Sequence, residues 1–144
     1  MTMGKNGVTG FIVPMDAESA HLVFHHRPVI PLFVKSFPDD LEVGDRAFLY
    51  VSGGRIIDGE GGVSSITREQ VGDVRRYGDQ LCLSSEELDR YVADSNKTES
   101  DDMLVLKIEE PTKYIRPMKC GMPIPRDGVY MTAEVFFTIL RENR

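Results

Sequence analysis

Basic and imidazole side chains concentrate in one stretch of the sequence, residues 21–35, which reads HLVFHHRPVIPLFVK. Its candidate ligand-binding residues are His26, Arg27 and Lys35. A guanidinium binds phosphate with two parallel hydrogen bonds, and both histidine and arginine stack on the flat ring of a base. The stretch therefore predicts contacts to phosphate or to a base edge. The alternative is that these cations only complement the dipole at the end of a helix.

The histidines do not favour a metal site. Such a site needs three or more protein ligands, and His25 and His26 are adjacent in a predicted helix, so their side chains point to different sides. His21 is the only other histidine. We therefore expect neither a metal ion nor a cofactor.

Two carboxylates, Asp58 and Glu60, lie in the glycine-rich stretch GGRIIDGEGG. A carboxylate at such a place is able to act as a general base or to accept a hydrogen bond from the amino group of a base. If the protein is an enzyme, we expect Lys35 and Glu60 to be its catalytic residues. Ser52, just before this stretch, is expected either to cap a turn or to line a cleft. The alternative for both carboxylates is exposure to solvent at a bend.

A second basic segment, residues 111–126, contains no acidic residue. Arg116 and Lys119 lie in it, and basic side chains in a segment punctuated by proline and glycine suit contacts to backbone phosphates. The alternative is a solvated loop. The sequence contains no G-x-S-x-G nucleophile motif and no glycine fingerprint for phosphate binding, which removes the best-known hydrolase and nucleotide-binding signatures.

The elements that must position these residues follow from local patterns. Two capping boxes, Thr67 with Gln70 and Ser84 with Glu87, each predict the start of a helix. The pair Gly53–Gly54 supplies the positive φ angles of a tight hairpin. The predicted strands cover residues 7–14, 31–35, 47–52, 55–63, 103–108 and 114–118, and the predicted helices lie at residues 17–26, after 67, after 84 and at 133–140.

This order lacks the strict alternation of strands and helices that a doubly wound sheet requires. It predicts an α+β fold, a mixed-strand pseudo-β-barrel with short helices packed at its openings. We expect a single domain over residues 1–144, because this length is enough for one core. The glycines of the strand at 55–63 permit either close backbone approach at a bend of the barrel or access for a flat ligand.

Charge and composition narrow the class of protein. The net charge of −6 argues against a protein that coats nucleic acid non-specifically. Residues 36–110 hold 18 acidic against eight basic residues, whereas both flanking segments are slightly basic, so their meeting would make a modest basic face on an acidic body. The alternative is an ordinary solvated acidic surface. Cys82 and Cys120 lie far apart, without a CxxC partner, and we expect free buried thiols.

No apolar run approaches the roughly 20 residues that span a bilayer, and the first 15 residues do not resemble a signal peptide. We expect a cytoplasmic protein without a membrane partner. The sequence leaves open whether Met1 or Met3 is the natural start.

Three stretches together resemble the PUA-like superfamily, in particular its ASCH and EVE branches and an archaeal family of PUA-like proteins. They read LEVGDRAFLYVSGGRIIDGEGGVSSI, YGDQLCLSSEELDRYV and LVLKIEEPTKYIRPM, and the resemblance covers about Phe11 to Met118. It implies a PUA-like pseudo-barrel whose cleft binds RNA or a modified base or nucleoside. The ASCH motif G-x-K-x-x-E-x-R is nearest to LFVKSFPDD, in which only Lys35 matches.

The function expected from these residues and this resemblance is an RNA-binding or modified-nucleotide-binding module. In this reading Lys35, Arg27 and Arg116 contact phosphate, and Glu60 and His26 contact a base edge. One alternative is a small amidohydrolase-like enzyme that acts on a modified nucleoside through Lys35 and Glu60. Another is a protein-interaction module that uses Phe136 and Phe137 of the tail; an exposed tail helix would also make a homodimer reasonable.

Overall fold

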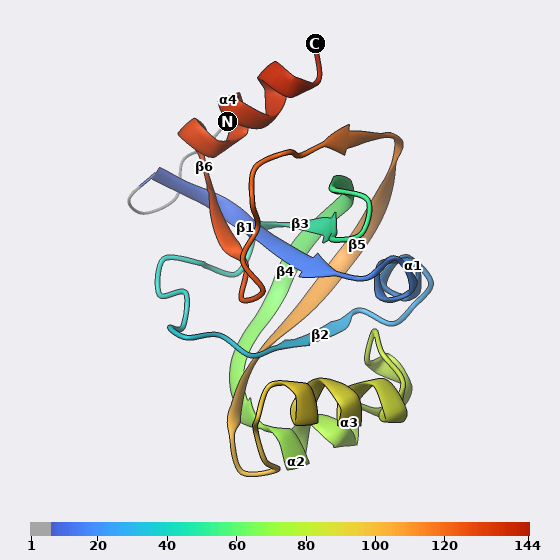
Figure 1. The fold of residues 1–144 in the computed structure, drawn as a ribbon. Helices are drawn as coiled ribbons and strands as arrows, with labels where there is room; N and C mark the ends of the chain where they lie inside the picture. The colour runs from blue at the N-terminus through green and yellow to red at the C-terminus, as the bar shows by residue number, and fades with distance from the viewer. Residues whose placement is uncertain (1–6) are drawn as a thin grey trace.

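The computed structural model describes residues 7–144, so Met1 and Met3 lie outside the described residues. Its strands and helices are arranged as Figure 1 shows. The strands are β1 (Val8–Met15), β2 (Val29–Leu32), β3 (Arg46–Val51), β4 (Ile56–Gln70), β5 (Asp102–Lys119) and β6 (Val129–Thr132). The helices are α1 (Ala17–Phe24), α2 (Val71–Val74), a 3-10 helix (Arg75–Gln80), α3 (Ser85–Asp94) and α4 (Ala133–Glu142).

The strands form one mixed sheet in the order β2-β5-β4-β3-β1-β6. β1 and β3 run parallel, and the other neighbouring strands run antiparallel. The chain after β2 crosses toward β6, where the backbone N–H of Asp40 donates a hydrogen bond to the Tyr130 hydroxyl oxygen at 3.2 Å. This contact joins the chain that leaves one edge strand, β2, to the other edge strand, β6. The predicted α+β class with a mixed sheet is therefore confirmed.

Three groups of buried side chains hold the elements together. One fills the curved face of the sheet, with Val13, Leu49 and Leu104 from β1, β3 and β5 among its members. A second packs α2 and α3 against β2 and β5, and a third packs α4 against the sheet through Ile139. In Figure 1, α2 and α3 lie at one end of the sheet and α4 lies at the other. α2, α3 and α4 therefore pack at the ends of the curved sheet, as predicted, whereas α1 contacts β3 and β5.

β4 and β5 are longer than the sequence predicts. The helix start predicted at Thr67 is wrong, because Thr67 pairs with Val105 and the ladder continues to Gln70. The Thr67 hydroxyl donates to the Glu69 carboxylate at 2.6 Å, and α2 begins at Val71 without a side-chain cap. The strands predicted separately at 103–108 and 114–118 belong to β5, which stays paired with β4 across several irregularities.

The other local predictions have mixed outcomes. The capping box of Ser84 and Glu87 is confirmed at the start of α3, and the tail forms the predicted helix, α4. The strand predicted at 31–35 is wrong at its end, because β2 stops at Leu32. The N–H of the next residue, Phe33, donates to the Tyr91 hydroxyl instead of to a neighbouring strand, so Lys35 lies in a bend. β6 was not among the predicted strands.

The glycines of β4 permit close packing. A Cβ atom at Gly59 would lie 2.5 Å from Cζ of Phe24, and one at Gly61 would overlap the side chain of Ile108. Real Cβ contacts are not this short, so these positions have no room for a larger residue. The predicted close approach at this strand is therefore present, and it serves the packing of α1 and β5.

Candidate functional site

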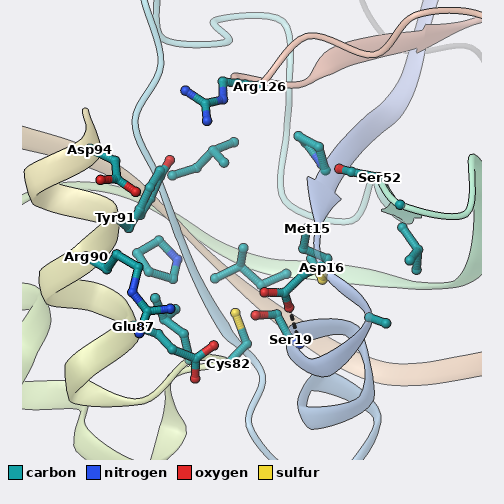
Figure 2. Close-up of a pocket in the computed structure, with 18 of the residues that line it drawn as sticks. Met15, Asp16, Ser19, Ser52, Cys82, Glu87, Arg90, Tyr91, Asp94 and Arg126 are labelled. Carbon is teal, nitrogen blue, oxygen red and sulfur yellow. Dashed lines mark hydrogen bonds between the residues drawn. The ribbon is translucent and has the colours of Figure 1, made fainter.

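A cleft of about 710 Å³ opens between α1 and α3. Its lining comes from the end of β1 and the start of α1, from β2, from the turn after β3, from α3, and from residues 124–126. Figure 2 shows the side chains that face it. The segments that meet here are far apart in sequence, and the long β4 and β5 strands hold their supporting elements in one sheet.

One wall of the cleft is α3, which is fixed to the chain after β2 through Tyr91. The Tyr91 hydroxyl oxygen accepts the Phe33 N–H at 2.8 Å, and the two rings pack with centroids 5.0 Å apart. Burial raises the pKa of Tyr91, so its hydroxyl stays protonated near neutral pH and keeps a hydrogen to donate. Tyr91 thus offers both a fixed aromatic surface and a neutral donor.

The inner part of the cleft contains the thiol of Cys82. Burial raises the pKa of this thiol to about 12, and the nearby carboxylates of Asp16 and Glu87 act in the same direction. The reactive form of cysteine is the thiolate, so a thiol with this pKa is a poor nucleophile at neutral pH. Cys82 therefore contributes an uncharged surface to the cleft. It lies buried as a free thiol, as does Cys120, which confirms the sequence prediction.

Charged side chains divide the cleft into two ends. Arg126 lies at one end of the cleft, and Asp16 and Glu87 lie at the other end. The Cys82 side chain lies between those of Asp16 and Glu87 (Figure 2). Arg90 and Asp94 add one charge of each sign along α3. The cleft therefore has an acidic inner end and a basic outer end. Between them lie apolar side chains from several elements: Met15, Ile30, Leu32, Val51, Leu83 and Ile124.

Both inner carboxylates are held by the starts of helices. Asp16 caps α1, and its Oδ1 accepts the Ser19 N–H at 2.8 Å. Glu87 is the third residue of α3, and its Oε1 accepts the Ser84 N–H at 3.0 Å. An acidic group is favoured in both positions by the helix dipole. The sequence signals that start these helices therefore also fix the orientation of the two carboxylates.

Of the residues predicted from the sequence, Ser52 lines this cleft. Arg27 lies elsewhere, where its Nε donates to the Asp79 carbonyl oxygen at 2.8 Å and its guanidinium pairs with the Asp79 carboxylate. His26 is exposed, with a left-handed φ of 72° just after α1. Lys35 is exposed in the bend after β2, and its backbone N–H lies 3.4 Å from the Asp127 carboxylate.

The remaining predicted residues lie on the distal parts of β4 and β5. Glu60 accepts hydrogen bonds from the Arg46 Nε at 2.8 Å and from the Tyr114 hydroxyl at 3.1 Å. Burial raises the pKa of Tyr114, and the charge and hydrogen bond of Glu60 act in the same direction. Arg116 and Lys119 are exposed on β5, outside the cleft lining. Glu60 therefore accepts its hydrogen bonds from groups other than Lys35.

The sequence patterns explain the charged residues of the cleft only by their local roles. The sequence predicts Glu87 as part of a capping box and places Arg126 at the end of the basic segment 111–126. Each carried a local signal, but none indicated that these segments meet. The one available signal was the polar character of Asp16 directly after the apolar strand β1.

Two further findings concern the described residues 7–144 as a whole. None of their helices is long and apolar enough to cross a membrane. Among these same residues, no three or more His, Cys, Asp or Glu side chains are grouped so as to hold a metal ion.

The fold is similar to that of two kinds of solved structure. The ASCH protein from Zymomonas mobilis superimposes with a TM-score of 0.70 at 16% identity, covering 92% of this chain and 94% of that chain. A mutant form of it gives a TM-score of 0.73 at 14% identity, with 94% and 96% covered. The N-terminal domain of Staphylothermus marinus McrB gives 0.64 at 14% identity, with 98% of both chains covered. These likenesses confirm the predicted PUA-like, ASCH-like fold.

In sequence, a family described as "Domain of unknown function (DUF365)" matches residues 8–133. No curated protein matches the sequence.

Proposed function

We propose that this chain, which belongs to the DUF365 family, binds RNA or a nucleotide by taking one base into the cleft between α1 and α3. The observation that carries the proposal is a cleft of about 710 Å³ with apolar walls and an arginine at its outer end. This volume lies within the usual range for sites that bind small molecules.

The chemistry of the cleft fits a base better than it fits a polyanion. Unstacked bases bind between apolar and aromatic side chains, and their edges pair with polar groups. Tyr91 and the apolar walls supply such surfaces, and Ser52 lies at the rim. The inner carboxylates of Asp16 and Glu87 would repel a phosphate, so the base enters first and the phosphate stays outside.

Arg126 is the phosphate contact in this proposal. It is exposed and stands at the outer end of the cleft, opposite the acidic inner end (Figure 2). The other basic residues proposed from the sequence, Lys35, Arg116 and Lys119, are exposed outside the cleft. They remain candidates for contacts to flanking phosphates of a longer RNA.

Hydrolysis by Lys35 and Glu60 has less support. Both carboxylate oxygens of Glu60 already accept hydrogen bonds, from Arg46 and Tyr114, and neither Lys35 nor Glu60 lines the cleft. The thiol of Cys82 is protonated at neutral pH. We therefore favour binding without turnover.

The test is fluorescence anisotropy with labelled seven-nucleotide single-stranded RNA and a matched duplex, at two salt concentrations. The Arg126→Ala variant is expected to weaken binding and to lower the slope of log affinity against log salt by about 0.7. Arg116→Ala is the matched control, an exposed arginine outside the cleft. Absence of binding at low salt, or an unchanged affinity in Arg126→Ala, would contradict the proposal.

Self-association through α4 is a second candidate role. Phe137 and Leu140 are 60% and 39% exposed on this helix, although Ile139 is fully buried. Glu134 lies in the first turn and Arg141 in the last. Two copies packed with antiparallel α4 helices would cover the apolar residues and bring Glu134 of one copy near Arg141 of the other. A second copy of the chain is therefore the occupant that this surface fits.

A further inference from the structure

Three exposed cations lead away from the outer end of the cleft. Arg126 lies at that end (Figure 2). Arg55 directly follows Gly54, which lines the cleft in the turn after β3. Lys119 lies beside Arg55, because the N–H of Cys120 donates a hydrogen bond to the Arg55 carbonyl oxygen at 2.9 Å. We call Arg126, Arg55 and Lys119 the basic track.

The side chains of the basic track have no partner within residues 7–144, since none of the three forms an ion pair or a side-chain hydrogen bond there. Five other arginines of the described chain do form ion pairs: Arg27, Arg46, Arg68, Arg75 and Arg76. An exposed cation without a carboxylate partner binds a phosphate without first breaking an ion pair. The track is therefore free to neutralise phosphates.

The backbone of the track is fixed at Lys119 by the end of α4. The Lys119 N–H donates to Oδ1 of Asn143 at 2.8 Å, and Nδ2 of Asn143 donates to the Lys119 carbonyl oxygen at 2.9 Å. The same Nδ2 donates to the Ile139 carbonyl oxygen at 2.8 Å. Binding to a surface that is already ordered costs less entropy than binding to a mobile loop.

The opposite side of the outer end carries the opposite charge. Asp94 and Ser52 lie on the two sides of this end, Asp94 on α3 and Ser52 in the turn that leads to Arg55 (Figure 2). Asp94 is exposed, and α3 holds four acidic residues against one basic residue. A phosphate chain is repelled by this side and attracted by the other.

We infer that a strand bound by one base leaves the cleft in one direction only, over the basic track and away from α3. The inference rests on the proposed function, because it assumes that a base occupies the cleft. Arg126 contacts the phosphate next to that base, and Arg55 and Lys119 contact the phosphates that follow. Nucleotides on one side of the bound base therefore add affinity, and nucleotides on its other side do not.

The test uses seven-nucleotide RNA strands with a single adenine and abasic sites elsewhere. The adenine is placed at the first or at the last position, so that both strands carry the same number of phosphates, and the pair is repeated with uracil. Each strand competes with a labelled, fully based RNA of seven nucleotides, the reference ligand. We expect one placement to bind about tenfold more tightly at 50 mM salt, and this advantage to fall about sevenfold by 200 mM, as two additional phosphate contacts require.

Two variants remove the charges of the track outside the cleft. Arg55→Gln and Lys119→Gln keep flexible polar side chains at exposed positions, so both are expected to fold normally. Each should halve the difference in salt slope between the two placements, and the double variant should bring their affinities to within about twofold. Lys107→Gln is the matched control, an exposed lysine of the same strand where it pairs with β2, and it should leave the advantage unchanged.

The outcomes separate the two proposals. Equal binding of the two placements, with tight binding of the reference RNA, would overturn the directional inference and leave the proposed function standing. An advantage that persists in the double variant would also overturn it. Failure of every strand and of the reference RNA to bind would overturn the proposed function and the inference together.

Discussion

The Tyr91 hydroxyl oxygen accepts the backbone N–H of Phe33 at 2.8 Å, and this contact joins α3 to the chain that leaves β2. The two segments are 58 residues apart in sequence. Their rings also pack, with centroids 5.0 Å apart. One side chain thus fixes the wall of the cleft and satisfies a backbone donor at the point where the sheet ladder ends.

Replacing Tyr91 with phenylalanine should destabilise the protein and weaken ligand binding. The variant keeps the ring but leaves the partly buried Phe33 N–H without its acceptor, which costs about 1–3 kcal/mol of unfolding free energy. Urea denaturation measures the loss, and anisotropy measures the affinity. Tyr77→Phe is the control, because its hydroxyl bonds Glu69 outside the cleft. Unchanged stability of Tyr91→Phe would contradict the structural role of this contact.

Gly59→Ala should be strongly destabilising. The added Cβ would lie 2.5 Å from Cζ of Phe24 and closer still to the Thr112 carbonyl oxygen, so backbone or α1 must shift. Overpacking of this kind costs about 1–3 kcal/mol. Gly53→Ala is the matched control, because nothing lies within 4 Å of its added Cβ. Equal melting temperatures for the two variants would show that β4 and α1 are not packed as described.

Stability should fall at high pH through Cys82. The ordinary thiol pKa of 9.0 applies in the unfolded chain, and burial raises it to about 12 in the fold. The folded state therefore holds this proton more tightly, so its contribution is complete below pH 9 and is lost as the pH rises from 9 toward 12. The expected slope is about 1.4 kcal/mol per pH unit.

The comparison that isolates this thiol is Cys82→Ala, because the raised pKa values of Tyr77 and Tyr91 act in the same direction in both proteins. Urea unfolding at pH 8, 9 and 10 should show a shallower decline for the variant. Identical slopes would mean that the Cys82 thiol ionises as readily in the fold as in the unfolded chain.

Phe137→Ser should weaken self-association without a large loss of stability. Phe137 is 60% exposed, so little of its ring supports the fold, whereas a second copy packed on α4 would bury it. Sedimentation equilibrium across a range of concentrations should show a dimer for the parent protein and a shift to monomer for the variant. Val43→Ser, at a residue 64% exposed outside α4, is the control. A parent protein that stays monomeric throughout would rule out this role.

The sequence predicts those elements whose signals are local and unopposed. Ser84 and Glu87 start α3 as a capping box, and the apolar spacing in the tail gives α4. The similar box at Thr67 fails, because pairing of β4 with β5 satisfies its backbone groups better than one helix turn would. A motif of four residues carries no information about β5, the partner strand that begins 35 residues after Thr67.

The cleft could not be assembled from the sequence for the same reason. Asp16, Glu87 and Arg126 each have a sufficient local explanation, as a cap or as part of a basic segment. Their convergence depends on the strand order, in which β1 lies between β3 and β6. The cations that the sequence predicts as ligand contacts, such as Lys35, lie in segments that the fold leaves at the surface.

The pairing of β2 with β5 has a consequence for synthesis on the ribosome. β2 is complete at Leu32, but the partner that pairs with it begins at Asp102, so a growing chain carries an unpaired apolar strand for about half of its length. β1 and β3 can pair early, whereas β2 must wait. A nascent chain of this protein is therefore most exposed to aggregation before β5 emerges, and slow translation of the segment between them would lengthen that interval.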